Sequence, residues 1–177
     1  DGFSSRLVSE LGAEFIPLPL EGRSTSPLQE LRSICVIWNI LRRKRPLFVF
    51  NFTIKMNVYS GLACASLNIP YANNISGLGT AFIHDSWLFR MVRQVYGLVN
   101  KRASQLFFQN EEDLSVFEKN GLLGTTPVTL LPGSGVDLTR FQASPLPTAG
   151  PVTFLMIARI LGDKGVREYA QAARLLK

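Results

Sequence analysis

The regular alternation of short apolar runs with helical patterns is the feature that most limits how this chain can fold. Runs typical of β-strands lie at 13–20, 47–50, 71–75, 105–109, 128–131 and 152–158. Segments whose composition and apolar spacing predict helices lie at 3–12, 27–45, 57–68, 86–103, 111–121 and 163–177. Parallel strands need crossover connections, which are usually helices. The sequence therefore predicts an α/β fold with a Rossmann-like, doubly wound parallel sheet.

A change in composition near the end of the chain predicts a domain boundary. The segment 142–151 is rich in Pro, Gly and Ala and is typical of a linker. We therefore expect one domain over 1–145, with 146–177 holding the linker and the start of a second domain.

The net charge of the chain limits the kinds of partner that it can bind. The net charge of +6 favours an anionic partner, which could be a phosphorylated ligand, a membrane surface or a nucleic acid. Nucleic acid is the weakest of these, because the basic residues are scattered and no binding motif appears. The basic run at 42–45 is typical of a solvated helix end, with attraction to anionic lipid heads as the alternative.

The sequence excludes a zinc site and gives only weak indications of catalytic histidine or glycosylation sites. One histidine and two separated cysteines exclude a zinc cluster. Cys35 and Cys64 both lie in apolar helical patterns, so we expect buried thiols in a reducing compartment. His84, just before a predicted helix, is more typical of a packing or cap residue than of a catalytic base. Two tripeptides, 51–53 and 74–76, match glycosylation sequons, which are common by chance.

Ligands of open parallel sheets bind outside the carboxyl ends of the strands, so the loops after strands are the candidate sites. These loops contain Lys55, the pair Gly77 and Gly79, and the pair Gly133 and Ser134. Taken alone, Lys55 is more typical of a solvated loop residue. The glycines could serve only tight turns, and 134–137 could be only a turn and helix cap.

Arg159 and Lys164 form the clearest candidate for phosphate binding. Arg159 follows a predicted strand, while Lys164 and Gly165 open the next predicted helix, with Asp163 as the expected N-cap. A helix N-terminus favours anions, and arginine adds a bidentate fork for phosphate oxygens. The segment has neither the spacing of a P-loop nor that of a dinucleotide-binding loop.

Two motifs in order, "LLPGSGVDLTRF" and "FLMIARILGDKGVREYAQAARLL", resemble the domain junction of family-4 glycosyltransferases with the GT-B fold. The upstream segments "NFTIKMNVYSGLACASLNIP", "NNISGLGTAF" and "LFFQNEEDLSVF" resemble the branch that builds bacterial surface polysaccharides, such as lipopolysaccharide and capsule. The resemblance runs over nearly the whole chain.

The resemblance implies an enzyme that transfers a sugar, with retention of configuration and without a metal, from a nucleotide-diphosphate donor to a lipid-linked or glycan acceptor. A UDP-sugar is the expected donor. Arg159 and Lys164 would hold its diphosphate and stabilise the leaving group, with Gly165, Gly133 and Ser134 also on the donor side. Lys55, Gly77 and Gly79 would line the acceptor side. The implied location is the cytoplasm, at the inner face of the bacterial membrane, with peripheral membrane contact.

The chain departs from that family at both ends. It lacks the family's first strand and glycine-rich loop, and it stops one strand and one helix into the second domain. We therefore expect a fragment that is inactive alone, and we expect 152–158 to fill the vacant strand position, from its own chain or in a strand-swapped dimer. A nucleotide-sugar epimerase of the same fold and a non-catalytic phosphate- or nucleotide-binding module are the alternatives.

Overall fold

The computed structural model describes residues 8–18, 27–78, 87–145 and 150–176, without the side chains of residues 87–89 and 163. The chain divides into two compact units, Asp1–Gly135 and Val136–Lys177. Unit 1 contains an all-parallel sheet whose strands lie in the order β1-β2-β3-β4. The strands are β1 (Val49–Phe52), β2 (Tyr71–Ile75), β3 (Gln105–Phe108) and β4 (Val128–Leu130).

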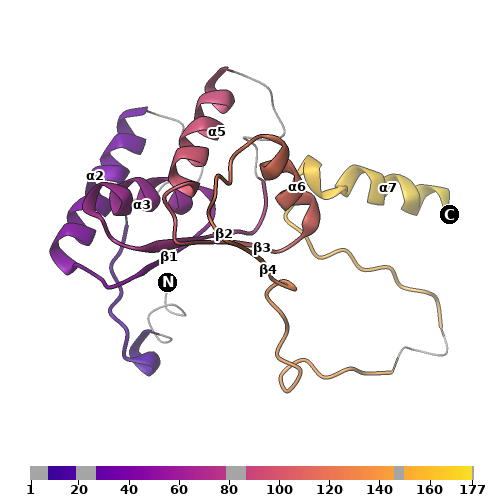
Figure 1. Cartoon of the computed structure of the whole chain (residues 1–177). Helices are drawn as coiled ribbons and strands as arrows, with labels where there is room; N and C mark the ends of the chain where they lie inside the picture. Colours follow the sequence, from indigo (N-terminus) through magenta and orange to yellow (C-terminus); the bar gives the residue numbers. More distant parts are fainter. Residues whose placement is uncertain (1–7, 19–26, 79–86, 146–149, 177) are drawn as a thin grey trace. The chain divides into compact units, whose positions relative to one another are not determined.

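Helices α3 (Ile54–Leu67), α5 (Trp87–Asn100) and α6 (Glu111–Lys119) connect consecutive strands of unit 1. Helix α2 (Pro27–Lys44) precedes β1, and residues 8–11 are also helical. The helices that follow β1, β2 and β3 lie on one face of the sheet, and α2 packs against α3 (Figure 1). The predicted α/β class with a parallel sheet is therefore confirmed.

The core of unit 1 lies between the sheet and these helices. Alternate strand residues, such as Leu106 and Phe108, are fully buried on this side. The ring of Phe117 from α6 meets those of Tyr96 and Phe108 edge-on, with centroids 5.3 and 5.2 Å apart. Gly61 lets α3 approach α5 closely, because a Cβ there would lie 2.3 Å from a methyl carbon of Val99.

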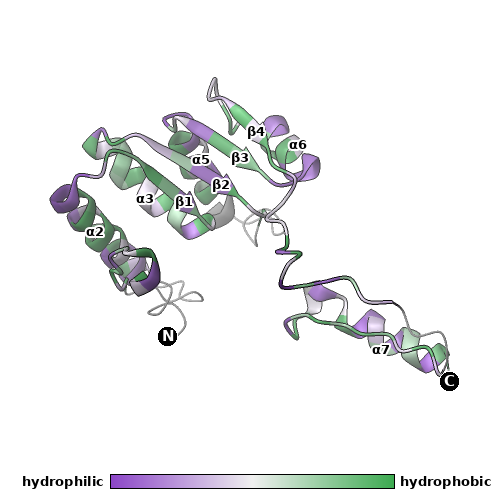
Figure 2. Cartoon of the chain, turned by 90° about the horizontal axis from the view of Figure 1, so that it is seen from below, coloured by the Kyte–Doolittle hydropathy of each residue, from purple (hydrophilic) through white to green (hydrophobic). Residues whose placement is uncertain are grey.

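The opposite face of the sheet is open in the described part of the chain. Seen from below, the strands lie in front of the helices (Figure 2). Phe50 and Phe52 of β1 expose 63% and 58% of their surface on this face. Parallel sheets are normally covered on both faces, and a continuous apolar run such as 47–50 is typical of a strand with such cover. The exposure of Phe50 and Phe52 departs from this pattern.

The described part of unit 2 contains the 3₁₀ turn η1 (Gly162–Lys164), followed by α7 (Val166–Leu175). None of the described residues of α7 is buried. The predicted helix at 163–177 is therefore present in shortened form. The hydroxyl of Tyr169 donates to the carbonyl of Phe154 at 2.7 Å, which holds α7 against the segment before it.

Two predicted strands are wrong. Residues 13–18 form no strand, and 19–20 lie outside the described residues; 152–158 form no strand either. A strand exists only through pairing, and in the described chain no neighbour extends the sheet to either segment. The prediction that 152–158 fills the vacant position within its own chain is therefore wrong, whereas exchange between two chains stays a prediction.

The apolar spacing within α2 predicts one buried face made of Leu28, Leu31, Cys35, Trp38 and Leu41, and this prediction is partly wrong. Leu28 and Leu31 are 81% and 59% exposed, and the expected burial of the Cys35 thiol is wrong as well. The helix buries Leu41, as predicted, together with Ser33 and Ile37. Ser33, Ile37 and Leu41 also recur at helical spacing, so periodicity alone could not decide which stripe is buried. Ser26, which the sequence predicts as the N-cap of this helix, lies outside the described residues.

Candidate functional site

The carboxyl end of β1 places Lys55 inside a helix rather than in a loop. Helix α3 begins at Ile54, three residues earlier than predicted, directly after the N-cap Thr53. Lys55 therefore lies in the first turn of α3, at the carboxyl edge of the sheet. This position matches the edge where parallel sheets bind ligands.

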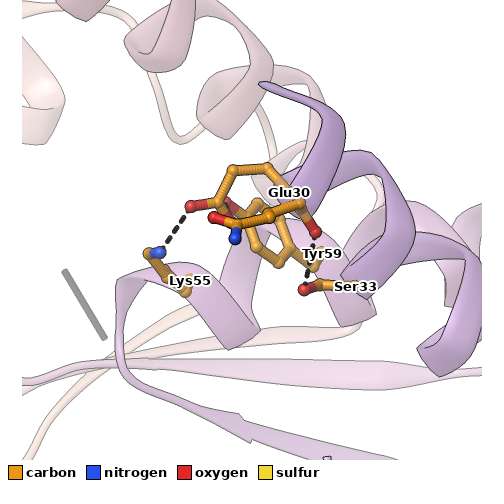
Figure 3. A network of polar contacts seen from close by, with 5 residues as sticks. Glu30, Ser33, Lys55 and Tyr59 are labelled. Atoms are coloured by element: carbon orange, nitrogen blue, oxygen red, sulfur yellow. Dashed lines mark hydrogen bonds and ion pairs between the residues drawn. The ribbon is translucent and has the colours of Figure 1, made fainter. Parts of the chain in front are cut away.

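Glu30 of α2 binds both Lys55 and Tyr59 of α3. Its two carboxylate oxygens accept from the Lys55 Nζ and the Tyr59 hydroxyl, each at 2.6 Å (Figure 3). Lys55 and Glu30 are only partly exposed, at 31% and 20% of their side chains. In the next turn of α2, Ser33 donates to the carbonyl of Gln29 at 2.9 Å. The lysine on the predicted acceptor side is thus an oriented group in a polar network and not simply a solvated loop lysine.

The electrostatics of this network favour an ionised Glu30 and a protonated Tyr59. Burial acts to raise the pKa of Glu30, but the hydrogen bonds from Lys55 and Tyr59 and the charge of Lys55 bring it below its ordinary value. Burial, together with the bond to the Glu30 carboxylate, raises the pKa of Tyr59 well above its ordinary value. At neutral pH the network therefore holds a carboxylate, an ammonium group and a protonated phenol, a set that can bind hydroxyl groups of a sugar.

Buried asparagines form a second polar network beneath this edge. The amide of Asn51 donates to the side-chain oxygen of Asn73, and Asn73 donates to that of Asn100, both at 2.9 Å. In α3, Asn57 donates to the carbonyl of Asn74 at 3.0 Å and to the Tyr96 hydroxyl at 2.7 Å. These side chains join β1, β2, α3 and α5. The sequence-based prediction did not include them, although asparagine inside otherwise apolar strands is a signal that could have found them.

The asparagines of both glycosylation sequons lie in strands of the sheet. Asn51 is a buried residue of β1, and Asn74 is a partly buried residue of β2 whose side-chain oxygen is fully covered. An oligosaccharide cannot be attached to either side chain in the folded unit. The matches are therefore chance occurrences in strand sequence.

The predicted glycine loop after β2 is described only in part. Gly77 follows β2 at the carboxyl edge, and a Cβ added to it would meet nothing within 4 Å. Gly79 and His84 lie outside the described residues. Lys55 and Gly77 thus follow neighbouring strands at the same edge.

The loop after β4 forms a turn. Gly133 has φ +89°, a conformation that favours glycine. Ser134 beside it is exposed. The carboxylate of Asp137 accepts from the backbone N–H and the hydroxyl of Thr139, at 2.9 and 2.6 Å, and these bonds hold its pKa below its ordinary value. The segment therefore forms a turn without a following helix, and its role in donor binding stays a prediction. The two units meet in sequence after Gly135.

Arg159, Lys164 and Gly165 lie within seven residues of one another in the sequence of unit 2. The Arg159 carbonyl accepts from the N–H of Leu161 at 2.8 Å, and Lys164 ends the 3₁₀ turn. Gly165, with φ +71°, is the N-cap of α7 and makes no side-chain cap bond. The prediction that Asp163 caps this helix is therefore wrong, because the intervening turn separates it from α7. Both cations remain close in sequence to the N-terminus of a ten-residue helix.

The basic end of α2 carries Arg42, Arg43 and Lys44 in its last turn. Lys44 binds Glu14 at 2.6 Å, and the Arg42 guanidinium lies 5.2 Å from the ring centroid of Trp38. Trp38 lines an apolar groove of about 400 Å³ between α2 and α3. In the described part of the chain, no helix is long and apolar enough to span a membrane. The same residues include no cluster of three or more potential metal ligands.

Comparison with known proteins supports the predicted resemblance. The chain is 27% identical over 194 residues to the N,N'-diacetylbacillosaminyl-diphospho-undecaprenol α-1,3-N-acetylgalactosaminyltransferase of Campylobacter jejuni subsp. jejuni serotype O:2. The match covers all of this chain and 51% of that protein, so the chain spans about half the length of this relative. No model of a known protein family matches the chain. The similarity to a glycosyltransferase, inferred from the motifs, is therefore confirmed.

Proposed function

We propose that this chain is part of a retaining glycosyltransferase, which moves a sugar from a nucleotide-diphosphate donor to a lipid-linked or glycan acceptor. It supplies most of the acceptor-side domain and the start of the donor-side domain. The observation that carries the proposal is the match over the full chain to a sugar-transferring enzyme. It is supported by the parallel sheet of unit 1, whose carboxyl edge carries Lys55 and Gly77. The relative's name describes an acceptor that carries a diphospho-undecaprenol group.

The polar network at that edge supplies groups for the acceptor side. The Lys55 ammonium can donate to a sugar hydroxyl, while the Glu30 carboxylate fixes its position. The charge of the pair is balanced, which suits a neutral sugar better than a phosphate. We therefore assign Lys55, with the glycine loop of Gly77 and Gly79, to recognition of the acceptor sugar.

The donor side is assigned to Arg159, Lys164 and Gly165, with Gly133 and Ser134 in the turn after β4. A guanidinium and an ammonium beside a helix N-terminus can bind the diphosphate and stabilise the charge that develops on the departing nucleotide. The expected donor is a UDP-sugar, and the chemistry assigned here uses side-chain cations instead of a metal.

The proposal is tested by joining this chain to the other half of the Campylobacter jejuni relative. We expect the chimera to transfer sugar from a UDP-sugar to a polyprenyl diphosphate-linked sugar, and the 177-residue chain alone to transfer none. Arg159→Ala and Lys164→Ala should each lower the rate at least about 100-fold, as for loss of an electrostatic transition-state contact. Arg174→Ala, which removes an exposed cation in the last turn of α7, is the matched control.

Three other results would contradict the proposal. Robust turnover by the isolated chain would show that the donor site is complete within it. Interconversion of UDP-sugars without transfer would indicate the epimerase. Nucleotide binding by a chimera that has neither activity would favour a non-catalytic module.

We also infer that the enzyme works in the cytoplasm at the inner face of the bacterial membrane. The support is the basic end of α2, together with the exposed side chains of Leu28 and Leu31 on the same helix. Each basic residue near an anionic lipid surface contributes about 1 kcal/mol to binding. Sedimentation with phosphatidylglycerol vesicles should therefore weaken for Arg43→Ala but not for Lys119→Ala, which removes a charge at the end of α6. Equal binding by both variants would contradict this location.

A further inference from the structure

Helix α3 carries a positive side chain at the end where the helix itself is already positive. Lys55 lies in its first turn, which contains no acidic residue, and Thr53 at the N-cap makes no side-chain bond to that turn. The N-terminus of a helix carries a partial positive charge, so the helix dipole disfavours a lysine at this position. A negative group from another element is therefore needed to balance the charge here.

Glu30 of α2 is such a group. It lies 25 residues earlier in the sequence, and one of its carboxylate oxygens accepts from the Lys55 Nζ at 2.6 Å (Figure 3). The other oxygen accepts from the Tyr59 hydroxyl, also at 2.6 Å, one turn further along α3. A carboxylate that is held at both oxygens thus occupies a position beside the ammonium group where an anionic group of a ligand would otherwise bind.

This network can be reached by a ligand at the carboxyl edge of the sheet. The side chains of Lys55 and Glu30 are partly exposed, so both can contact a bound molecule, but neither is fully hydrated. Charges in such a position are screened less by water and salt than charges on the open surface. The charge of Glu30 therefore acts strongly on any charged group that comes close to Lys55.

The other ion pair of a lysine with a glutamate on α2 or near it has a different setting. Lys44 and Glu14 also lie 2.6 Å apart, but their side chains are 51% and 65% exposed. Lys44 lies in the last turn of α2, where the helix dipole favours a cation. Glu14 thus forms an ordinary surface pair, whereas Glu30 compensates a charge that its helix disfavours.

We propose that Glu30 is the specificity-determining residue of this site, which admits an uncharged sugar and excludes a sugar with a carboxylate or phosphate group next to Lys55. The hydroxyl groups of an uncharged sugar can both accept from the ammonium group and donate to the carboxylate. An anionic group beside Lys55 would lie close to the fixed carboxylate of Glu30, and like charges in a partly buried site repel strongly. Tyr59 is a positioning residue, because it acts on the ligand only through Glu30.

This inference deepens the proposed function and rests on it, because the proposed function assigns Lys55 to the acceptor sugar. It adds the chemical class of that sugar and names the residue that selects it. The selection can be measured as binding by the chain itself, without any sugar transfer.

NMR titration of the isotope-labelled chain tests the proposal. The probes are methyl glucoside, methyl glucuronide, which differs from it by one carboxylate, and inorganic phosphate. The backbone amides of residue 55 and Gly77 report binding at this edge. We expect the unmodified chain to bind methyl glucuronide at least about tenfold more weakly than methyl glucoside. In Glu30→Gln, both anions should bind at least about tenfold more tightly than in the unmodified chain, because the carboxylate charge beside Lys55 is gone.

Three further variants show where the effect arises. Glu14→Gln is the matched control, because it changes the net charge equally and also removes a carboxylate from a lysine. It should leave the response of the Lys55 amide to both anions unchanged. Tyr59→Phe should give a smaller gain in anion binding than Glu30→Gln, because the carboxylate is then held at one oxygen only. Glu30→Gln combined with Lys55→Gln should lose the gain, and circular dichroism confirms that each variant folds.

The proposal is overturned if the unmodified chain and Glu30→Gln respond equally to the two anions at residue 55, whether both bind them or neither does. An equal gain in Glu14→Gln would also overturn it, since net charge would then be the cause. Failure of the proposed function has a different result. If Glu30→Gln gains the anions but neither chain binds methyl glucoside, Glu30 excludes anions as inferred, and the assignment of the acceptor sugar to this edge is wrong.

Discussion

At the scale of single residues, the Glu30 network shows how position changes the meaning of a charged side chain. In the sequence, Lys55 was an isolated cation after a strand. In the structure, it shares a carboxylate with a tyrosine from the next turn of the same helix. Glu30 itself could not be identified from the sequence, because its partners lie 25 and 29 residues away.

We expect Glu30→Gln to lower the free energy of unfolding by about 1–2 kcal/mol at pH 7, as for loss of a partly buried, charge-assisted hydrogen bond. Glu14→Gln is the matched control. It also removes a carboxylate that binds a lysine, but its partner Lys44 and Glu14 itself are 51% and 65% exposed. The control should change stability by less than about 0.5 kcal/mol. Urea unfolding measures both values, and equal effects would contradict the prediction.

The ion pair of Glu30 with Lys55 predicts that the free energy of unfolding depends on pH. The pKa of Glu30 is lower in the folded chain than its ordinary value, so the unfolded chain binds more protons as the pH falls. The stabilisation from Glu30 is therefore complete above the unfolded pKa and is lost as the pH falls through the folded pKa. The difference between wild type and Glu30→Gln should be constant from about pH 6 to 8 and should shrink below about pH 4. A difference that grows in acid would contradict this sign.

At the scale of elements, the sequence predicted well what local patterns determine. The strand at 71–75 has the predicted bounds, and the strands at 105–109 and 128–131 are each one residue shorter than predicted. The predicted strands at 13–18 and 152–158 were wrong because strand formation depends on a neighbour that the sequence does not reveal. The buried asparagine network could not be predicted for a similar reason, since it depends on the register of β1 against β2.

The contact between α3 and α5 gives a prediction about packing. Gly61→Ala places a methyl group against Val99, which is only 1% exposed and has little room to move. Overpacking costs about 1–3 kcal/mol, whereas alanine gains up to about 1 kcal/mol in helix propensity over glycine. We therefore expect net destabilisation of about 1–2 kcal/mol by thermal or urea unfolding.

A double mutant separates the clash from other effects of Gly61→Ala. Val99→Ala makes room for the new methyl group, so the combined loss should be smaller than the sum of the two single losses. Strict additivity would show that the contact between α3 and α5 is not the cause. Gly162→Ala, where a Cβ meets nothing within 4 Å, should show no clash of this kind.

At the scale of the whole molecule, the two units differ in how much they bury. Unit 1 holds the described core, and α7 of unit 2 buries none of its described residues. The sequence predicted a linker at 142–151 and a second domain after it. It could not predict that the described residues leave one face of the sheet uncovered, because the cover of a strand depends on segments that are distant in sequence.

Hydrogen exchange should show this difference directly. Amides of α7 should exchange at least about 100-fold faster than those of β2, because an isolated short helix is marginally stable while the central strand opens only with the whole unit. Comparable protection in both elements would show that α7 has found a buried partner. Repeating the measurement at low and high concentration separates a partner within the chain from one in another copy.

The two cysteines give the molecule a practical property that follows from their positions. Cys35 is exposed on α2, whereas Cys64 is fully buried in α3 and burial raises the pKa of its thiol. A maleimide dye should therefore attach once to the native chain and twice to the denatured chain. The unmodified protein thus has a single site for fluorescent labelling beside the α2–α3 groove. The rate at which the second adduct appears in mass spectra measures how fast the core opens.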